Sequence, residues 1–204
     1  RYRQDKESFF ELEPVRSIRW WFQISPLASL LFLAILFFVT QFIHGALFHA
    51  SLNTALWDFG FFDQVMWNTA HGNFLITSVR GGLHLFAEHF KPLLVPISFI
   101  YRVSDNTNLF FALTTLIHAT SLIAGYAIAK QVLSSHRMGL VFALGVFFYQ
   151  PYINGINFLF HSQVLANPLL LFGFLCAIRK NVKWMFLFFV LALMCKENIT
   201  LDVL

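Results

Sequence analysis

Charged residues are scarce in this chain. Lys, Arg, Asp and Glu make up 12% of its 204 residues, whereas a soluble domain contains about 25%. So few charges cannot cover the surface of a domain of this size in water. The two cysteines exclude a disulfide-stabilised scaffold, and the 58% of hydrophobic residues, among them 27 Phe, exclude a disordered chain. The composition therefore predicts a membrane protein with several spans and excludes a soluble enzyme.

The small excess of basic residues gives a net charge of +4 and an isoelectric point near 9.3. These residues form no basic stripe and instead flank apolar blocks. The pattern excludes a nucleic-acid partner and indicates that the chain's partner is membrane lipid.

Five apolar stretches approach the roughly 20 residues that a helix needs to cross a bilayer, and they cover residues 26–48, 109–129, 138–156, 163–178 and 184–195. Pro151 should bend or end the third of them. The run Leu93–Tyr101 is too short to span and contains Pro96, which predicts an interfacial or re-entrant helix. The expected fold class is an all-α, polytopic transmembrane bundle of about five spans. Its long outer loop, about 49–108, should contain interfacial helices.

The basic residues indicate how this bundle is oriented. A cytoplasmic N-terminus places ten of the 14 on the inner side, and the outer side then holds Arg80, Lys91, Arg102 and Lys196. This arrangement satisfies the positive-inside rule at every short loop. We therefore expect a multi-pass protein of the plasma membrane with a cytoplasmic or interfacial tail at 1–22. Residues 23–204 would form the N-terminal part of a larger transmembrane domain.

Two acidic residues begin the outer loop. Asp58 and Asp63 are five residues apart, which does not place them on one helical face. Gly60 favours a break between them, so that Asp58 caps a helix that starts near Phe61. One reading makes either carboxylate a general base, and the other makes Asp58 a cap and Asp63 a surface acid.

A second polar segment runs from Arg80 to Pro92. His84 and Glu88 have the spacing of one helical face, with His89 beside them, so these three side chains are candidate metal ligands. Their spacing matches neither zinc-protease helix motif. An anion held by Arg80, His84, His89 and Lys91 is the alternative, and a simple polar turn is the third.

Three more outer candidates lie later in the chain, and they are His161, Lys196 and Glu197. Ionisable residues that follow a long uncharged run are costly in a membrane and are functional candidates. His118 falls in the middle of the second predicted span, where we expect an interhelical hydrogen bond.

Four motifs resemble those of one family. DFGFFDQVMWNTAHG (58–72) and GGLHLFAEHFKP (81–92) resemble outer-loop stretches of a family of predicted bacterial and archaeal membrane proteins of unknown function. FHSQ (160–163) resembles its Asp-Phe-His-Pro-Glu stretch, and CKEN (195–198) resembles its Cys-Lys-Glu-Asp stretch. The sequence departs from the family at Asn157, Ser162, Gln163 and Asn198, where acids or a Pro-Glu pair would be expected. These departures weaken roles assigned to those positions.

That family is grouped with the GT-C glycosyltransferases, and this resemblance implies an activity. A sugar would pass from a polyprenyl-phosphate donor to an acceptor hydroxyl at the outer face, with Asp58 or Asp63 as the base. The substrate and its phosphate would be bound by Arg80, His84, Glu88, His89, Lys91, His161, Lys196 and Glu197. A divalent metal remains open as a cofactor, and so does the oligomeric state. The competing classes are a membrane transporter or channel and a non-catalytic membrane protein.

Overall fold

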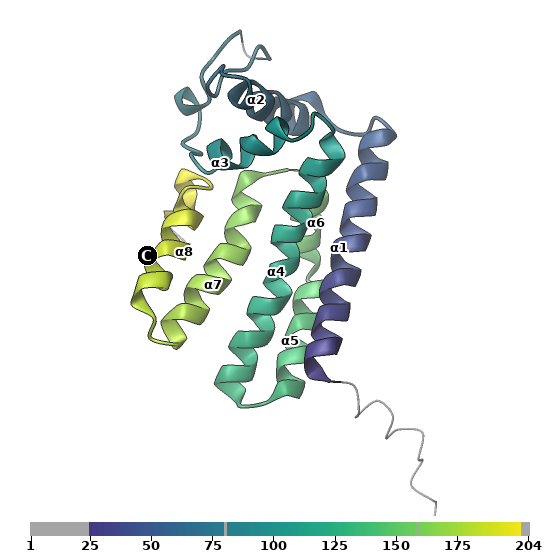
Figure 1. The fold of residues 1–204 in the computed structure, drawn as a ribbon, viewed down its shortest axis with the longest axis vertical. Coiled ribbons are helices and arrows are strands. Elements are labelled where there is room, and N and C mark those ends of the chain that lie inside the picture. Colours follow the sequence, from purple (N-terminus) through teal and green to yellow (C-terminus); the bar gives the residue numbers. More distant parts are fainter. Residues whose placement is uncertain (1–24, 80, 159, 201–204) are drawn as a thin grey trace, which may run out of the picture.

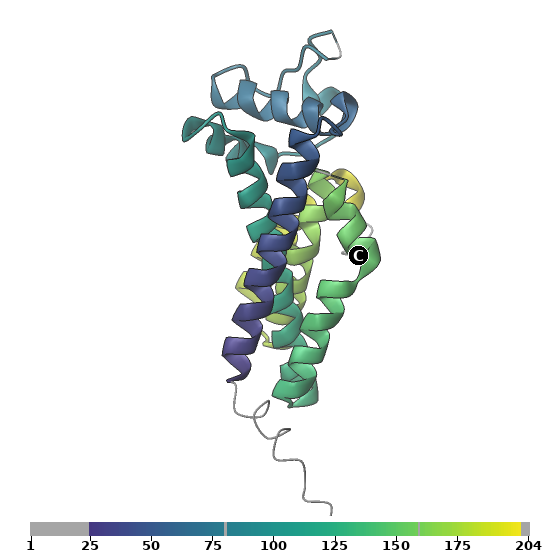
Figure 2. The ribbon, with the colours of Figure 1, turned by 90° about the vertical axis from the view of Figure 1, so that its right-hand side faces the viewer.

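The computed structural model describes residues 25–79, 81–158 and 160–200. Its regular structure is helical in these ranges, apart from an isolated antiparallel bridge between Ile76 and His84. Six helices form an elongated bundle, and residues 51–79 and 81–106 fold as a cap over one of its ends (Figures 1 and 2). The expected tail at 1–22 lies outside the described residues, as does Arg80.

The bundle is built around one central helix. The six helices are α1 (Pro26–Ala50), α4 (Thr107–Leu133), α5 (His136–Phe148), α6 (Gln150–Asn157), α7 (Ala166–Ile178) and α8 (Val182–Leu193). Helix α4 packs against α1, α5 and α7, whereas α8 packs mainly against α7. The α7–α8 pair approaches closely at Gly173, where any side chain would collide with the ring of Phe189.

Short polar segments set the helix boundaries. The side chain of Asn106 accepts a hydrogen bond from the Asn108 amide at 2.9 Å and caps α4, and Ser135 caps α5 through the Met138 amide at 3.3 Å. Pro151 lies in the first turn of α6, where a missing amide proton is tolerated. The axes of α5 and α6 differ there by 46°, which confirms the bend predicted at Pro151.

The predicted spans are all helical but differ in length. Helices α1 and α4 are long and apolar enough to cross a membrane, and α5 with α6 meets the same condition as one bent pair. The segments Ser162–Ile178 and Val182–Leu193 are shorter apolar helices. The described residues therefore contain two or three candidate spans, and the expected number of five is not established by helix length.

The cap consists of short helices that lie across the end of the bundle. They are η2 (Leu56–Gly60), α2 (Phe61–Ala70), η3 (Leu85–Ala87), α3 (Leu94–Ser98) and η4 (Phe99–Arg102). The apolar run 93–101 forms α3 and most of η4, so it ends within the cap. Helix α2 begins at Phe61, where the sequence predicted a helix start. The break predicted at Gly60 is wrong, because the π-helix η2 runs directly into α2 and no side chain caps that junction.

Two hydrophobic cores hold the molecule together. The bundle core includes Phe37 and Leu122. The cap core includes Phe62 and Met66 of α2, and it continues into residues of the bundle, namely Phe110, Leu165 and Cys195. In the cap, each fully buried Phe or Leu stabilises the folded state by roughly 1.5–3 kcal/mol relative to exposure to water. This shared core fixes the cap on the ends of α4, α7 and α8.

Candidate functional site

Three segments that are distant in the sequence meet between the cap and the bundle. They are the loop 88–93, the 3-10 helix η5 (Ser162–Leu165) that precedes α7, and the turn after α8 that continues into η6 (Glu197–Ile199). The Leu93 amide donates to the Met194 carbonyl oxygen at 3.0 Å, so the loop lies on the end of α8. We call the polar side chains at this contact the junction cluster, which comprises His89, Lys91, Gln163, Lys196 and Glu197.

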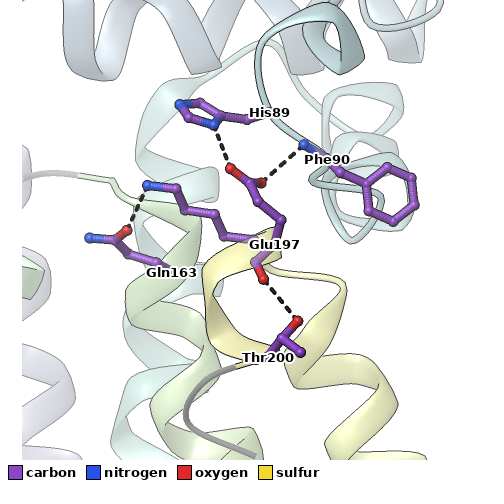
Figure 3. A network of polar contacts seen from close by, with 6 residues as sticks. His89, Phe90, Gln163, Glu197 and Thr200 are labelled. Carbon is purple, nitrogen blue, oxygen red and sulfur yellow. Dashed lines mark hydrogen bonds and ion pairs between the residues drawn. The ribbon is translucent and has the colours of Figure 1, made fainter.

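The carboxylate of Glu197 is held by the cap loop (Figure 3). Nδ1 of His89 donates to its Oε1 at 2.7 Å, and the Phe90 amide donates to its Oε2 at 3.1 Å. Burial alone would raise the pKa of Glu197, but hydrogen bonds from backbone amides and from His89 outweigh burial and lower that pKa. Glu197 is therefore ionised at neutral pH, and both of its oxygens already have donors.

The two lysines of the junction cluster lack such compensation. Lys196 donates from Nζ to Oε1 of Gln163 at 3.1 Å, which is a neutral acceptor. Lys91 is 4% exposed, and its Nζ lies 4.3 Å from the ring centroid of Phe62, a cation–π arrangement. The Glu197 carboxylate contacts His89 at 2.7 Å, and neither lysine forms an ion pair with any carboxylate in the described part of the chain.

Burial and charge repulsion both act on Lys91. Desolvation of the ammonium group, followed by repulsion from Lys196, lowers its pKa to about 8, against the attraction of Glu197. A buried ammonium without a counter-ion is costly. An anion bound beside both amines would offset that cost, and lysine is a common phosphate ligand in proteins. The junction cluster is therefore a candidate anion site.

A second polar cluster lies on the same helix as Phe62. The hydroxyl of Tyr101 donates to Oδ1 of Asp63. Burial raises the pKa of Asp63, while the hydrogen bond from Tyr101 and the nearby His49 act in the opposite direction. Burial and the Asp63 carboxylate likewise raise the pKa of Tyr101. Asp63 thus has a raised proton affinity, which suits a general base.

The structure places the other predicted residues elsewhere. His84 forms the bridge with Ile76, and its Nδ1 accepts from the Phe86 amide at 3.2 Å. Because His84 and Glu88 flank the three-residue helix η3, the helical face predicted for them is wrong. The described residues contain no group of three His, Cys, Asp or Glu that could hold a metal ion. Arg80 and the side chain of Asp58 lie outside the described part.

His161 is not part of the junction cluster. It lines a small pocket inside the bundle together with His118, and its ring centroid lies 6.5 Å from that of Phe62. Nδ1 of His118 lies 2.9 Å from the Tyr152 hydroxyl, which confirms the predicted interhelical hydrogen bond. Of the ten residues predicted for the site, the junction therefore gathers His89, Lys91, Lys196 and Glu197.

Several contributing residues were missed by sequence reasoning. Gln163, which accepts from Lys196, stands where the resembling family carries Glu, and that position was the available signal. Phe62 and Tyr101 carry no polar motif and look like ordinary core residues in the sequence. Their roles depend on contacts between segments that the sequence does not reveal.

The chain forms an all-helical bundle with candidate membrane spans and a polar cap on one end. These features place it in the class of helical membrane proteins. Residues 48–204 match a family described as predicted membrane protein, DUF2079. The chain belongs to this family, as its motifs indicated. The matched range includes the whole junction cluster and Asp63. No curated protein and no solved structure gave a significant match.

Proposed function

We propose that the protein is a GT-C-like membrane glycosyltransferase that takes a sugar from a polyprenyl phosphate and passes it to an acceptor hydroxyl. One observation carries the proposal: Lys91 and Lys196 place two ammonium groups at the cap–bundle junction without a paired carboxylate among the described residues. These amines would hold the phosphate of the donor. Charge stabilisation of a leaving phosphate is the largest expected contribution to such a reaction.

Asp63 is the proposed base. Its raised pKa supports this role, and it lies on α2, the helix that also carries the Phe62 ring beside Lys91. It would take the proton of the acceptor hydroxyl as the oxygen attacks the anomeric carbon and the bond to the phosphate oxygen breaks. General-base catalysis contributes typically 10²–10⁴-fold. Asp58 remains the second candidate for this role.

The proposed orientation places the cap outside and the N-terminus in the cytoplasm of a plasma-membrane protein. The turns α4–α5 and α7–α8 lie at the end of the bundle opposite the cap (Figure 1). The basic residues near these turns are Lys130, Arg137, Arg179, Lys180 and Lys183, as the positive-inside rule requires. In intact cells, a cysteine introduced at Leu83 should react with a membrane-impermeant maleimide and one introduced at Lys180 should not. The reverse result would overturn the orientation.

Binding of farnesyl phosphate, a short polyprenyl phosphate, tests the proposed anion site in the full-length protein. We expect farnesyl phosphate to bind at least tenfold more tightly than farnesol, as measured by calorimetry in detergent. Lys196→Met should remove that preference. Lys183→Met, an exposed lysine at the opposite end, should retain it. Equal binding of phosphate and alcohol by the native protein would contradict the proposal.

A transporter is the second candidate, and one observation favours it. Helices α1, α4 and α6 enclose a polar pocket that contains His118, a residue of a candidate span. Polar groups at such depth occur in transport pathways. Loss of sugar transfer on substitution of Asp63, with donor binding retained, would favour the transferase over the transporter.

A further inference from the structure

An apolar groove lies on the side of the bundle between α5, α6 and α7. Its volume is about 630 Å³, within the range of roughly 300–1,000 Å³ that is typical of ligand pockets. Helices α5 and α7 both pack against α4, which leaves the groove between them. Apart from two tyrosines and one asparagine the lining is apolar, and it includes Val141, Phe142, Gly145, Val146, Leu170 and Leu171.

The groove opens onto a surface that faces lipid. Val141 and Phe142 line it and are 55% and 49% exposed. They belong to α5, which together with α6 is long and apolar enough to cross a membrane as one bent pair. Exposed apolar side chains on such a span contact the hydrocarbon of the bilayer. The groove is therefore continuous with the lipid-facing surface, and acyl chains surround its opening.

A glycine keeps the groove open. Gly145 lies within α5, where glycine destabilises a helix relative to alanine. Other helical glycines have a packing reason, since a Cβ would lie 2.7 Å from Tyr126 at Gly139 and 2.4 Å from Phe189 at Gly173. A Cβ at Gly145 would meet no neighbouring side chain of the described chain within 4 Å. Contacts between the described helices therefore do not explain Gly145, whose missing side chain widens the groove.

One polar side chain lines the groove near the cap. Asn167 is exposed and lies in the first turn of α7, at the end of that helix nearest the cap (Figure 1). Its side-chain amide forms no hydrogen bond with another described residue. An amide without a partner is costly in hydrocarbon. It therefore points to an occupant that carries a hydrogen-bond acceptor at this end of the groove.

We propose that the groove binds one phospholipid from the leaflet on the cap side. An acyl chain of this lipid lies along α5, and the Asn167 side chain donates to one of its ester carbonyl oxygens. From Val141 to Phe148, α5 rises about 10 Å, and one leaflet contributes about 15 Å of hydrocarbon. The groove thus matches most of the depth of one chain. The proposal is independent of the glycosyltransferase function, because none of these residues belongs to the junction cluster.

Other occupants fit the groove less well. A polyprenyl phosphate offers no ester carbonyl, and the lining contains no cationic side chain for its phosphate. A helix of a second copy, about 10–12 Å across, has a volume of roughly 800–1,100 Å³ over the same height, which exceeds the volume of the groove. Phospholipid is the partner whose width and acceptor groups both match.

Native mass spectrometry of the full-length protein tests the site by counting bound lipids. The protein would be reconstituted with dioleoyl-phosphatidylcholine and then transferred to a mild detergent. Gly145→Phe should retain one phospholipid fewer than the native protein, because its ring fills the groove. Leu144→Phe, at an exposed neighbouring position that does not line the groove, is the matched control and should keep the native count.

Equal counts for Gly145→Phe and the native protein would overturn the proposal. Gly145→Leu serves the same purpose if the first variant does not insert into the membrane. Exchange of the bound phospholipid for an equal amount of farnesyl phosphate would assign the groove to the donor's chain, and a lipid-free dimer would assign it to a second copy. Either result contradicts the proposal.

The contact with Asn167 is tested with two lipids that differ at the ester. The native protein should bind the diester phosphatidylcholine about threefold more tightly than its diether analogue, which is the effect of one hydrogen bond in a membrane. Asn167→Leu should bind both lipids equally. Equal binding of the two lipids by the native protein would show that Asn167 does not hold the ester.

Discussion

The basic residues at the two ends of the bundle lie in opposite environments, exposed at one end and buried or half-buried at the other. At the end away from the cap, all five basic residues are exposed, and no acidic residue of the described chain accompanies them. At the cap end, Lys91 is buried and Lys196 is half-buried, and the acidic residues of the described chain are in the cap and in the turn after α8. Exposed charges serve to orient the helices at little energetic cost, whereas a buried ammonium is costly. The difference indicates that the cap-end lysines have a function beyond topology.

The largest effect should come from removing the proposed base at the cap end. Asp63→Asn should lower the turnover of sugar transfer by about 10²–10⁴-fold, because the amide cannot accept the hydroxyl proton. Turnover would be measured in membranes with polyprenyl-phosphate hexoses as donors.

Lys130→Gln, at the opposite end, is the control for this measurement and should leave turnover unchanged. Farnesyl phosphate binding should survive in both variants. Normal turnover in Asp63→Asn would show that the cap end does not supply the base, and the two ends would then not differ in catalysis.

The pH dependence of anion binding should show that Lys91 contributes to the site. Its pKa near 8 means that its charge is lost as the pH rises through that value, far below the range of an exposed lysine. A phosphate monoester stays doubly ionised above about pH 7, so the ligand does not change over this interval. Affinity for farnesyl phosphate should therefore fall between pH 7 and pH 9, and Lys91→Met should flatten the profile. A flat profile in the native protein would place the phosphate away from Lys91.

The smallest effect concerns stability. Lys91→Met removes a buried ammonium and should raise the free energy of unfolding by roughly 1 kcal/mol, after the loss of the cation–π contact is subtracted. The pKa of Lys91 is lower in the folded than in the unfolded chain. The native protein therefore gains stability as the pH rises from about 8 toward 10.5, and the advantage of the variant should shrink over that interval.

Unfolding in mixed micelles measures this change. Lys183→Met should shift the free energy by less than about 0.5 kcal/mol, because that lysine is exposed. A destabilised Lys91→Met protein would show instead that the ammonium group is held by favourable contacts in the folded state.

Local sequence patterns were sufficient to predict most of the fold. Apolar length located the six helices of the bundle, and the fixed backbone angle of Pro151 predicted the bend before α6. The start of α2 near Phe61 was predicted correctly, whereas the break at Gly60 was predicted wrongly. A carboxylate before a helix usually caps it, but here the chain coils continuously through η2 and Gly60.

The candidate site was predicted only in part, because it depends on long-range packing. Charge and depth identified Lys196 and Glu197, and a motif drew attention to His89 and Lys91. No local pattern could indicate that Glu197 would reach His89 across 108 positions, or that Lys91 would lie on Phe62. His84 and His161 were grouped with these residues because they share a chemical type, and the fold places them at other sites.

The hydrogen bond between Leu93 and Met194 has a mechanical consequence. It attaches the cap loop to α8, a helix of 12 residues that is about 18 Å long. This is shorter than the roughly 30 Å of a bilayer's hydrocarbon layer, and helices adjust to such a mismatch by tilting or by thinning the lipid around them. We therefore expect a displacement of the end of α8 to be passed to the loop that carries Lys91 through this hydrogen bond. Anion affinity should therefore vary with the acyl-chain length of the surrounding lipid.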